Sequence, residues 1–318
     1  MKLSHNQRFL LAHAVILFSA IFFGCSPIPT IRHTMMKMLL PFASKPIPLL
    51  RGHAHNDYQH AQPLCDALAR GFTSIEVDIH LIDGQLLVAH DKQDVRSDRT
   101  LQSLYLNPLR ERISQHGGRV YPGGPPITLL IDIKSDAEST YVVLRDVLNE
   151  YMEILTTYGP DGRQEGALVA IISGNRPLEI MKTETIRCAA CDGRAEDLDS
   201  VAPASLIPLI SDKWSALFTW KGDSTMPTEE QQNLIDFIDT AHSNGRRVRF
   251  WATPDDSSQA RYEVWQELIA ADVDFINTDD LQGLQQFLIE HDPLVFTSLL
   301  RCLWRRISHL ITGANWYN

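Results

Sequence analysis

Residues 74–91 read SIEVDIHLIDGQLLVAHD, and this stretch carries the pattern that decides the fold. Side chains of a β-strand alternate between its two faces, so Glu76, Asp78 and His80 share one face. The residues between them are Val and Ile, as expected for a strand that packs against a helix layer. An exposed edge strand is the alternative, which the apolar opposite face and the apolar residues 86–89 disfavour. The pattern indicates a buried strand whose polar face points into a barrel.

Short apolar or β-branched runs alternate with amphipathic stretches from residue 49 onward. The runs predict strands over residues 49–53, 74–80 with a continuation over 85–89, 127–134, 167–173, 186–190, 205–211, 247–252 and 275–277. The intervening stretches predict helices over residues 63–70, 137–158, 177–183, 228–244, 257–271 and 281–291. About eight strands alternating with helices predict a single (β/α)₈ TIM barrel. A doubly wound open sheet is the rival, but the first strand lacks the G-x-G-x-x-G turn that this fold favours.

The bulk composition of the 318 residues restricts the class of protein. Hydrophobic residues make up 44% and charged residues 21%, which is ordinary for a globular chain with a buried core. The formal net charge of -10 disfavours nucleic acid as a partner, because basic surfaces hold phosphate backbones. An acidic protein that acts on a phosphate ester therefore needs a local cation, either a metal ion or a basic side chain.

The N-terminal region predicts a targeting segment rather than part of the fold. Lys2 and Arg8 precede a mostly apolar run, which suits a signal peptide and is short for a membrane span of roughly twenty residues. Cys25 after a small residue suggests a lipoprotein signal over residues 1–25, and the Pro-containing residues 26–48 predict a tether. We therefore expect an exported protein, secreted or in the cell envelope, with lipidation at Cys25 or an uncleaved anchor as the two routes to membrane contact.

The barrel is expected over residues 49–292, and an amphipathic extension over residues 293–318. We expect this extension to pack on the barrel, with contact to a membrane surface as the alternative.

Cys188 and Cys191 form a C-A-A-C pair that lacks the second pair or the histidines of a zinc site. Two free thiols and a local disulfide are the alternatives for this pair.

Three carboxylates on two predicted strands point to a divalent cation. Glu76 and Asp78 repel each other when buried two residues apart, so they need either a proton or a cation. Asp132 and Lys134 interrupt the apolar run of the next strand, again on one face. A buried ion pair is one interpretation of these two residues. Beside Glu76 and Asp78, Asp132 is better interpreted as a third ligand, and hard oxygen ligands favour Mg²⁺ or Ca²⁺.

Further polar residues lie at the predicted strand ends, where TIM barrels keep their functional groups. His90 ends the segment after the second strand, and Asp91 is a candidate to orient its ring, with a turn cap as the alternative. Trp251 ends a late strand, where its indole would form a pocket floor or pack in the core. His53 ends the first strand at the start of the polar run HAHND.

Taken in order, these motifs resemble the glycerophosphodiester phosphodiesterase and phosphatidylinositol-phospholipase-C-like superfamily. Its signatures are a His after the first strand, an E-x-D on the second, a downstream H-D and an acidic-x-Lys on the third. They correspond here to His53, residues 76–78, residues 90–91 and residues 132–134. The sequence of residues 52–91 is similar to that of the branch named after altered inheritance of mitochondria protein 6. The resemblance covers about residues 49–288.

The resemblance implies a metal-dependent phosphodiesterase on a TIM barrel of the phospholipase-C-like type. His53 and His90 would flank the phosphorus as acid and base. Lys134 and the ion would neutralise the nonbridging oxygens. The ion would be bound by Glu76, Asp78 and Asp132.

One departure from the family bears on the substrate. Glycerophosphodiesterases have His-Arg-Gly where this chain has His53-Ala54-His55, and their Pro-Glu-Asn motif is replaced by Gln62-Pro63. Glycerophosphodiesters are therefore not expected as the substrate, and the loop residues His55, Asn56 and Asp57 are expected to contact it instead.

The sequence therefore predicts a phosphoric diester hydrolase acting on a lipid-derived or small-molecule substrate, and no protein partner is inferred. A phosphomonoesterase and a non-catalytic surface binding protein on the same barrel are the alternatives.

Overall fold

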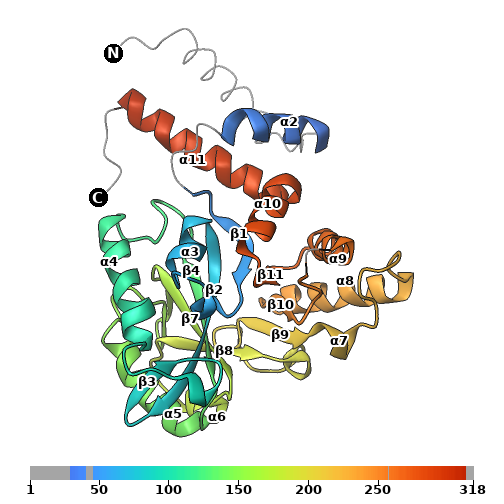
Figure 1. The fold of residues 1–318 in the computed structure, drawn as a ribbon. Coiled ribbons are helices and arrows are strands. Elements are labelled where there is room, and N and C mark those ends of the chain that lie inside the picture. The colour runs from blue at the N-terminus through green and yellow to red at the C-terminus, as the bar shows by residue number, and fades with distance from the viewer. Residues whose placement is uncertain (1–28, 41–45, 257, 313–318) are drawn as a thin grey trace.

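The protein folds as a closed β-barrel surrounded by helices (Figure 1). The structure is a computed structural model that describes residues 29–40, 46–256 and 258–312, with side chains over 34–40, 46–256 and 258–303. In this part of the chain the parallel strands follow the order β1-β11-β10-β9-β8-β7-β4-β2, and β1 also pairs with β2, which closes the sheet. The expected (β/α)₈ TIM barrel is confirmed.

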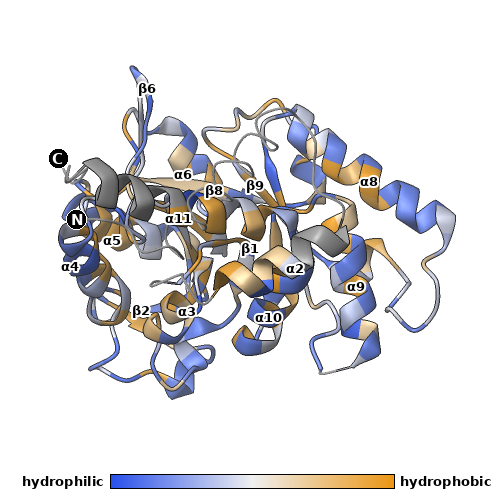
Figure 2. Cartoon of the chain, turned by 90° about the horizontal axis from the view of Figure 1, so that it is seen from above, coloured by the Kyte–Doolittle hydropathy of each residue, from blue (hydrophilic) through white to orange (hydrophobic). Residues whose placement is uncertain are grey.

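The barrel strands are β1 (Leu49–Ala54), β2 (Phe72–Ile82), β4 (Ile127–Ile133), β7 (Leu168–Gly174), β8 (Ala189–Gly193), β9 (Leu209–Lys213), β10 (Arg247–Trp251) and β11 (Phe275–Thr278). The helices between and after them are α3 (Cys65–Ala69), α4 (Asn107–Gln115), α5 (Ala137–Asn149), α6 (Leu178–Thr183), α7 (Trp214–Leu217), α8 (Thr228–Ser243), α9 (Gln259–Ala270) and α10 (Leu281–His291). Figure 2 shows α8 with a largely hydrophilic exterior and the central strands with hydrophobic residues, as expected for helices that cover a buried sheet.

The second strand does not simply continue over residues 85–89, and that expectation is wrong. Strand β3 (Gln85–Val88) pairs antiparallel with β2 and lies outside the barrel order. Asp83 and Gly84 have φ angles of 49° and 77°, the left-handed conformations that a two-residue hairpin turn requires. The reversal brings the chain back along β2, where His80 Nε2 lies 3.2 Å from the carbonyl oxygen of His90.

The strands predicted over residues 186–190 and 205–211 lie later in the chain. Residue Ile186 is exposed, and pairing with β7 begins only at Ala189. Strand β9 is shifted in the same direction.

The helix predicted over residues 137–158 ends at Asn149 instead, and its expected last turn belongs to the hairpin of β5 (Thr157–Gly159) and β6 (Gly162–Gln164). The pair Cys188 and Cys191 consists of free thiols.

Two further helices lie side by side over the end of the barrel where β1 begins (Figure 1). Helix α2 (Pro29–Leu39) falls within the predicted tether, yet it packs on α10 and α11 and buries Met36. Helix α11 (Pro293–Thr312) buries Val295, Phe296 and Leu299 against the domain, so the apolar stripe of the predicted extension is a packing face. The predicted signal segment over residues 1–25 lies outside the described residues.

The interior of the barrel is divided into an apolar floor and a polar upper layer. A small apolar cluster fills the floor and consists of Leu130, Val169, Ile171, Leu209 and Phe275. Nearer the C-terminal ends of the strands, register places Asp78 beside Asp132 and Asp132 beside Ser173. The same end of a TIM barrel carries the active site in enzymes of this fold.

We expect Gly71→Ala to lower the free energy of unfolding by about 2–4 kcal/mol, measured by urea denaturation. Gly71 has a φ of +91°, and an added Cβ would overlap with the carbonyl oxygen of Ile47. Gly84→Ala is the matched control, because Gly84 has a φ of +77° and open space around it. The control should lose only about 1–2 kcal/mol for its left-handed backbone. Equal losses in both variants would contradict the steric contribution.

Candidate active site

Three carboxylates meet where the end of β4 lies beside the middle of β2. One oxygen from each of Glu76, Asp78 and Asp132 lies within 4.8 Å of the others. Glu76 and Asp78 are buried, so their mutual repulsion is poorly screened. Asp78 Oδ1 is buried without a hydrogen-bond donor, as expected for an oxygen reserved for a cation. These residues fit a divalent ion with oxygen ligands.

Two basic side chains partly neutralise the three carboxylates. Lys134 Nζ lies 3.2 Å from Asp78 Oδ2 and 3.2 Å from Asp132 Oδ1. On the other side, Arg249 Nη1 contacts Glu76 Oε2. Burial disfavours the Glu76 carboxylate, but Arg249 and the neighbouring imidazole outweigh it and hold the pKa of Glu76 well below its usual range. Burial, reinforced by Asp78 and Glu76, raises the pKa of Asp132 to about 6 despite Lys134. A further cation beside Asp132 would therefore stabilise its carboxylate form.

His53 lies beneath the site and does not line the cleft. Its side chain is 1% exposed, and both ring nitrogens have partners. Nδ1 lies 2.7 Å from Ser74 Oγ, while Nε2 lies 2.9 Å from Glu76 Oε2 and 2.6 Å from Arg249 Nη1. Burial and the nearby Arg249 lower the pKa of His53 to about 4, so the imidazole is neutral at pH 7. This environment suits a residue that positions Glu76 better than one that exchanges protons with a substrate.

Two other histidines, His55 and His90, line the same cleft as the triad residues Glu76 and Asp132. His55 is 26% exposed and its Nδ1 lies 2.8 Å from Asp279 Oδ1. His90 is 54% exposed and its Nδ1 lies 2.9 Å from Asp78 Oδ2. A carboxylate on Nδ1 fixes the tautomer and leaves Nε2 as the nitrogen for proton transfer. Burial alone would lower the pKa of His55, but Asp279 and Glu76 outweigh it and raise that pKa above its ordinary value.

Close contacts between polar side chains lead from one cleft histidine to the other. Asn56 Nδ2 lies 3.2 Å from His55 Nδ1, and Asn56 Oδ1 lies 2.8 Å from the Tyr58 hydroxyl. The Tyr58 hydroxyl lies 2.7 Å from Asp78 Oδ2 and 3.3 Å from His90 Nδ1. The polar loop after β1 therefore fixes the position of both histidines relative to the triad.

The structure contradicts the expected role of Asp57 in contacting the substrate. Its side chain is fully buried, where Oδ2 accepts hydrogen bonds from the backbone of Leu64 at 2.5 Å and from the Tyr105 hydroxyl at 2.8 Å. Asp57 turns inward because Asn56 takes a left-handed conformation, with a φ of 45°. It anchors the loop that carries His55.

The expected role of Asp91 is also wrong. Asp91 is exposed, and the carboxylate that contacts the His90 ring is Asp78. The β2–β3 hairpin brings His90 back to β2, so its partner lies 12 residues earlier in the chain rather than next in sequence.

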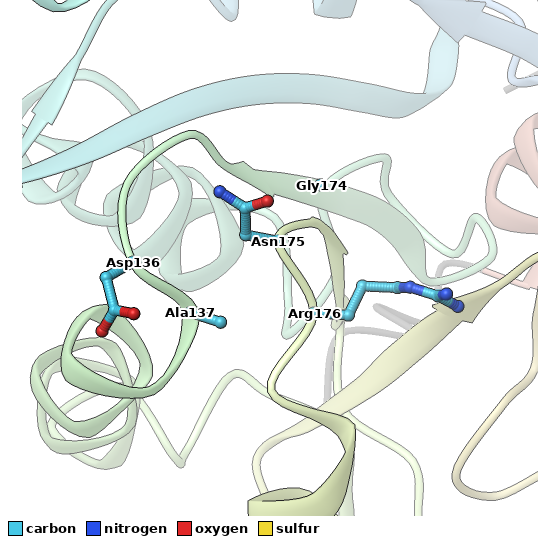
Figure 3. Close-up of a pocket in the computed structure, with 5 residues that line it drawn as sticks. All are labelled: Asp136, Ala137, Gly174, Asn175 and Arg176. Carbon is cyan, nitrogen blue, oxygen red and sulfur yellow. The ribbon is translucent and has the colours of Figure 1, made fainter.

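The cleft above the triad has a volume of about 420 Å³. Its lining includes the expected His55, Asn56, Lys134 and Trp251. The opposite wall comes from the ends of β7 and β8 and was not predicted: Ser173, Asn175, Asp192 and Arg194. A more open pocket of about 550 Å³ adjoins the cleft through Gly174 and Asn175, between the loops after β4 and β7 (Figure 3).

The sequence contained signals for some of the residues that were missed. Arg249 stands two residues before Trp251 on the same strand, so the two share a face and Arg249 was detectable by alternation. Asp279 follows β11, at the strand end where barrel sites form. Asp192 was hidden because the predicted strand ended at residue 190, two residues too early.

The fold and the site define a TIM-barrel protein with a candidate metal centre and paired histidines at the C-terminal mouth of the barrel. Residues 43–192 match the family described as the AIM6-like phosphodiesterase domain. The predicted relationship to the branch of altered inheritance of mitochondria protein 6, within a phosphodiesterase superfamily, is confirmed.

Curated relatives support the same branch. Altered inheritance of mitochondria protein 6 of Eremothecium gossypii is 27% identical over 276 residues, covering 77% of this chain and 71% of that protein. The protein of the same name from Lachancea thermotolerans is 29% identical over 272 residues, with 72% of this chain and 63% of that protein covered. The homolog from Arthroderma benhamiae is 26% identical over 320 residues, with 87% and 98% covered.

The prediction of export to the cell envelope or medium is wrong. The curated relatives are named for the inheritance of mitochondria, and these names do not refer to secretion or a cell envelope. Across the described residues, no helix is both long enough and apolar enough to cross a membrane. Cys25, the expected lipidation site, lies outside the described part of the chain.

Adding Mg²⁺ or Ca²⁺ to chelator-treated protein is expected to stabilise the fold, because an ion that binds only the folded state shifts the unfolding equilibrium. At a hundredfold excess over Kd the gain should be about 2.7 kcal/mol, measured by thermal or urea unfolding. Asp132→Asn should weaken binding at least about tenfold in titration calorimetry. Asp91→Asn removes the same charge from an exposed position and should bind as wild type does. Unchanged affinity in Asp132→Asn would contradict the assignment.

Proposed function

We propose that the chain is a metal-dependent phosphoric diester hydrolase acting on a lipid-derived or small-molecule phosphodiester. One observation carries the proposal: two carboxylate-held histidines, His55 and His90, line the same cleft as a buried acidic triad. Hydrolysis of a phosphodiester uses a base to activate the nucleophile, an acid to protonate the leaving oxygen and a cation to neutralise the phosphate. The match to an AIM6-like phosphodiesterase domain supports the same reaction class.

In this proposal His55 and His90 act as acid and base through Nε2. One accepts the proton of the attacking hydroxyl group or water, and the other protonates the leaving oxygen. Asp279 and Asp78 hold the Nδ1 atoms and stabilise each imidazolium as it forms. His55 thus takes the role that the motif suggested for His53, and His53 positions Glu76.

The charge balance of the site favours a diester over a monoester. Glu76, Asp78 and Asp132 carry one negative charge more than Lys134 and Arg249 offset. A divalent cation held by the triad would supply charge neutralisation at the nonbridging phosphate oxygens. The centre then carries one net positive charge, which matches the single negative charge of a phosphodiester. Lys134 and Arg249 would contact the phosphate directly.

Replacing either cleft histidine is expected to lower kcat for bis-p-nitrophenyl phosphate by about 10²–10⁴-fold, since general acid or base catalysis is lost. His55→Ala and His90→Ala should retain metal binding and thermal stability. His53→Gln should lower the melting temperature and metal affinity, because it removes a partner of Glu76.

His242→Ala is the matched control for these variants. His242 pairs with Asp274 before β11 begins, at the end of the barrel opposite the cleft, and its replacement should leave kcat unchanged. A wild-type protein that hydrolyses no phosphodiester with Mg²⁺, Mn²⁺ or Ca²⁺ would overturn the proposal in favour of a non-catalytic binding protein.

The balance of charge predicts a preference between two chromogenic substrates. We expect kcat/KM for bis-p-nitrophenyl phosphate to exceed that for p-nitrophenyl phosphate by about tenfold or more, since the second charge of a monoester is uncompensated in a partly buried site. The opposite preference would identify a phosphomonoesterase.

A further inference from the structure

We propose that α2 and α11, together called the basic cap, dock on an anionic membrane surface and hold the mouth of the barrel away from that membrane. The two helices lie side by side at the end where β1 begins, whereas the β2–β3 hairpin beside the cleft lies at the opposite end (Figure 1). The docking does not depend on the proposed hydrolysis. Only its consequence for the substrate rests on that function.

The basic cap differs in charge from the chain that carries it. The sequence of its two helices contains no Asp or Glu, although the whole chain has 39 of them and a formal net charge of -10. Its basic residues are Arg32, Lys37, Arg301, Arg305 and Arg306. An acidic protein that concentrates positive charge at one end is attracted through that end to a negative surface, such as a bilayer with anionic lipids.

Two of these cations are available at the surface of the cap. Lys37 on α2 and Arg301 on α11 are exposed to solvent. Neither side chain forms an ion pair with a carboxylate in the described part of the chain. A cation that no carboxylate neutralises keeps its attraction for the head groups of anionic lipids, so both residues can contribute to docking.

An apolar side chain lies beside one of these cations. Met38 follows Lys37 on α2 and is 63% exposed, whereas Met36 is buried and Met35 and Leu39 pack against the core. An exposed apolar group next to a cation suits the boundary between lipid head groups and acyl chains, where both find a favourable environment. A nucleic-acid backbone would use only the cations, and the net charge of the chain disfavours that partner.

Packing on the barrel explains the inner faces of the two helices but not their charge. Val295, Phe296 and Leu299 of α11 are buried, as is Met36 of α2. Such packing requires apolar residues on the inner face and leaves the outer positions open to either sign of charge. The lack of acidic residues in both helices is therefore a property that a purely structural cap does not require.

Docking through the cap determines which way the cleft faces. Helix α11 contacts β1, the strand that begins at this end and leads to the loop with His55 and Asn56 at the cleft. The parallel strands thus separate the cap from the mouth, and the mouth opens to water. If the chain is a phosphodiesterase, its substrate is then a water-soluble phosphodiester rather than a lipid of the membrane that holds the protein.

Binding of the full chain to lipid vesicles tests the docking. The wild type should sediment with vesicles of phosphatidylcholine and phosphatidylserine, and far less with vesicles of phosphatidylcholine alone. Raising the ionic strength from about 0.1 M to about 1 M shortens the Debye length from about 10 Å to about 3 Å and should weaken binding about tenfold or more. The apolar run of residues 9–23 is present in every sample and does not distinguish the two kinds of vesicle.

Two double variants locate the docking face. Lys37→Gln with Arg301→Gln should lower the affinity for serine-containing vesicles about tenfold or more, because each cation near an anionic surface contributes about fivefold. Lys92→Gln with Lys221→Gln is the matched control, since it removes two exposed cations from loops at the mouth end. The control should bind as the wild type does, and thermal unfolding should show that both variants keep their fold.

Three results would overturn the docking. The first is equal binding of the wild type to both kinds of vesicle. The second is a loss of affinity in the control as large as that in the cap variant, which would mean that the mouth also faces the membrane. The third is tighter binding to double-stranded DNA than to the anionic vesicles, which would identify nucleic acid as the partner of the cap.

Hydrolysis of bis-p-nitrophenyl phosphate separates this inference from the proposed function. Vesicle-bound protein should hydrolyse this soluble diester with the same kcat/KM as free protein, because the cleft stays open to water. A loss of activity on binding to vesicles would contradict the proposed orientation. A protein that binds anionic vesicles through the cap and hydrolyses no phosphodiester would support the docking and overturn the proposed function.

Discussion

The repulsion among three buried carboxylates is the constraint on which the rest of the site depends. Glu76, Asp78 and Asp132 lie within 4.8 Å of one another in a place that water reaches poorly. Such a cluster is stable only when cations surround it. Lys134 and Arg249 supply part of that charge, and a divalent ion held by the triad would complete it. Lys134, Arg249 and His90 each contact one of the three carboxylates.

The same carboxylates connect the candidate metal site with the neighbouring histidines. Asp78 contributes one oxygen to the cluster, while its Oδ2 holds His90 and the Tyr58 hydroxyl. Glu76 is paired with Arg249 and His53 beneath the cleft. A substitution of either carboxylate would therefore alter both the candidate cation site and the position of a histidine. This coupling explains why a buried histidine that contacts no cleft surface still belongs to the functional centre.

Closure of the barrel decides which polar residues share the cleft. Strand β1 pairs with both β2 and β11, and this brings the loop after β1 beside Asp279. The end of β8 lies two strands from β4 in the sheet order and supplies Asp192 and Arg194 to the same cleft.

The sequence alone predicted the barrel class and the grouping of Glu76, Asp78 and Asp132, because alternation along a strand is a local property that survives without knowledge of neighbours. It placed His90 at the end of a strand segment. It placed the acid–base function on His53, whereas the structure puts His55 in the cleft, two residues further along the chain. Only the tertiary structure paired His90 with Asp78, turned Asp57 inward and added Asp192 and Arg194. Those positions depend on the hairpin at Asp83-Gly84, on strand register and on closure of the barrel. Each of these is a relation between segments that lie apart in the sequence, so no local pattern contains it.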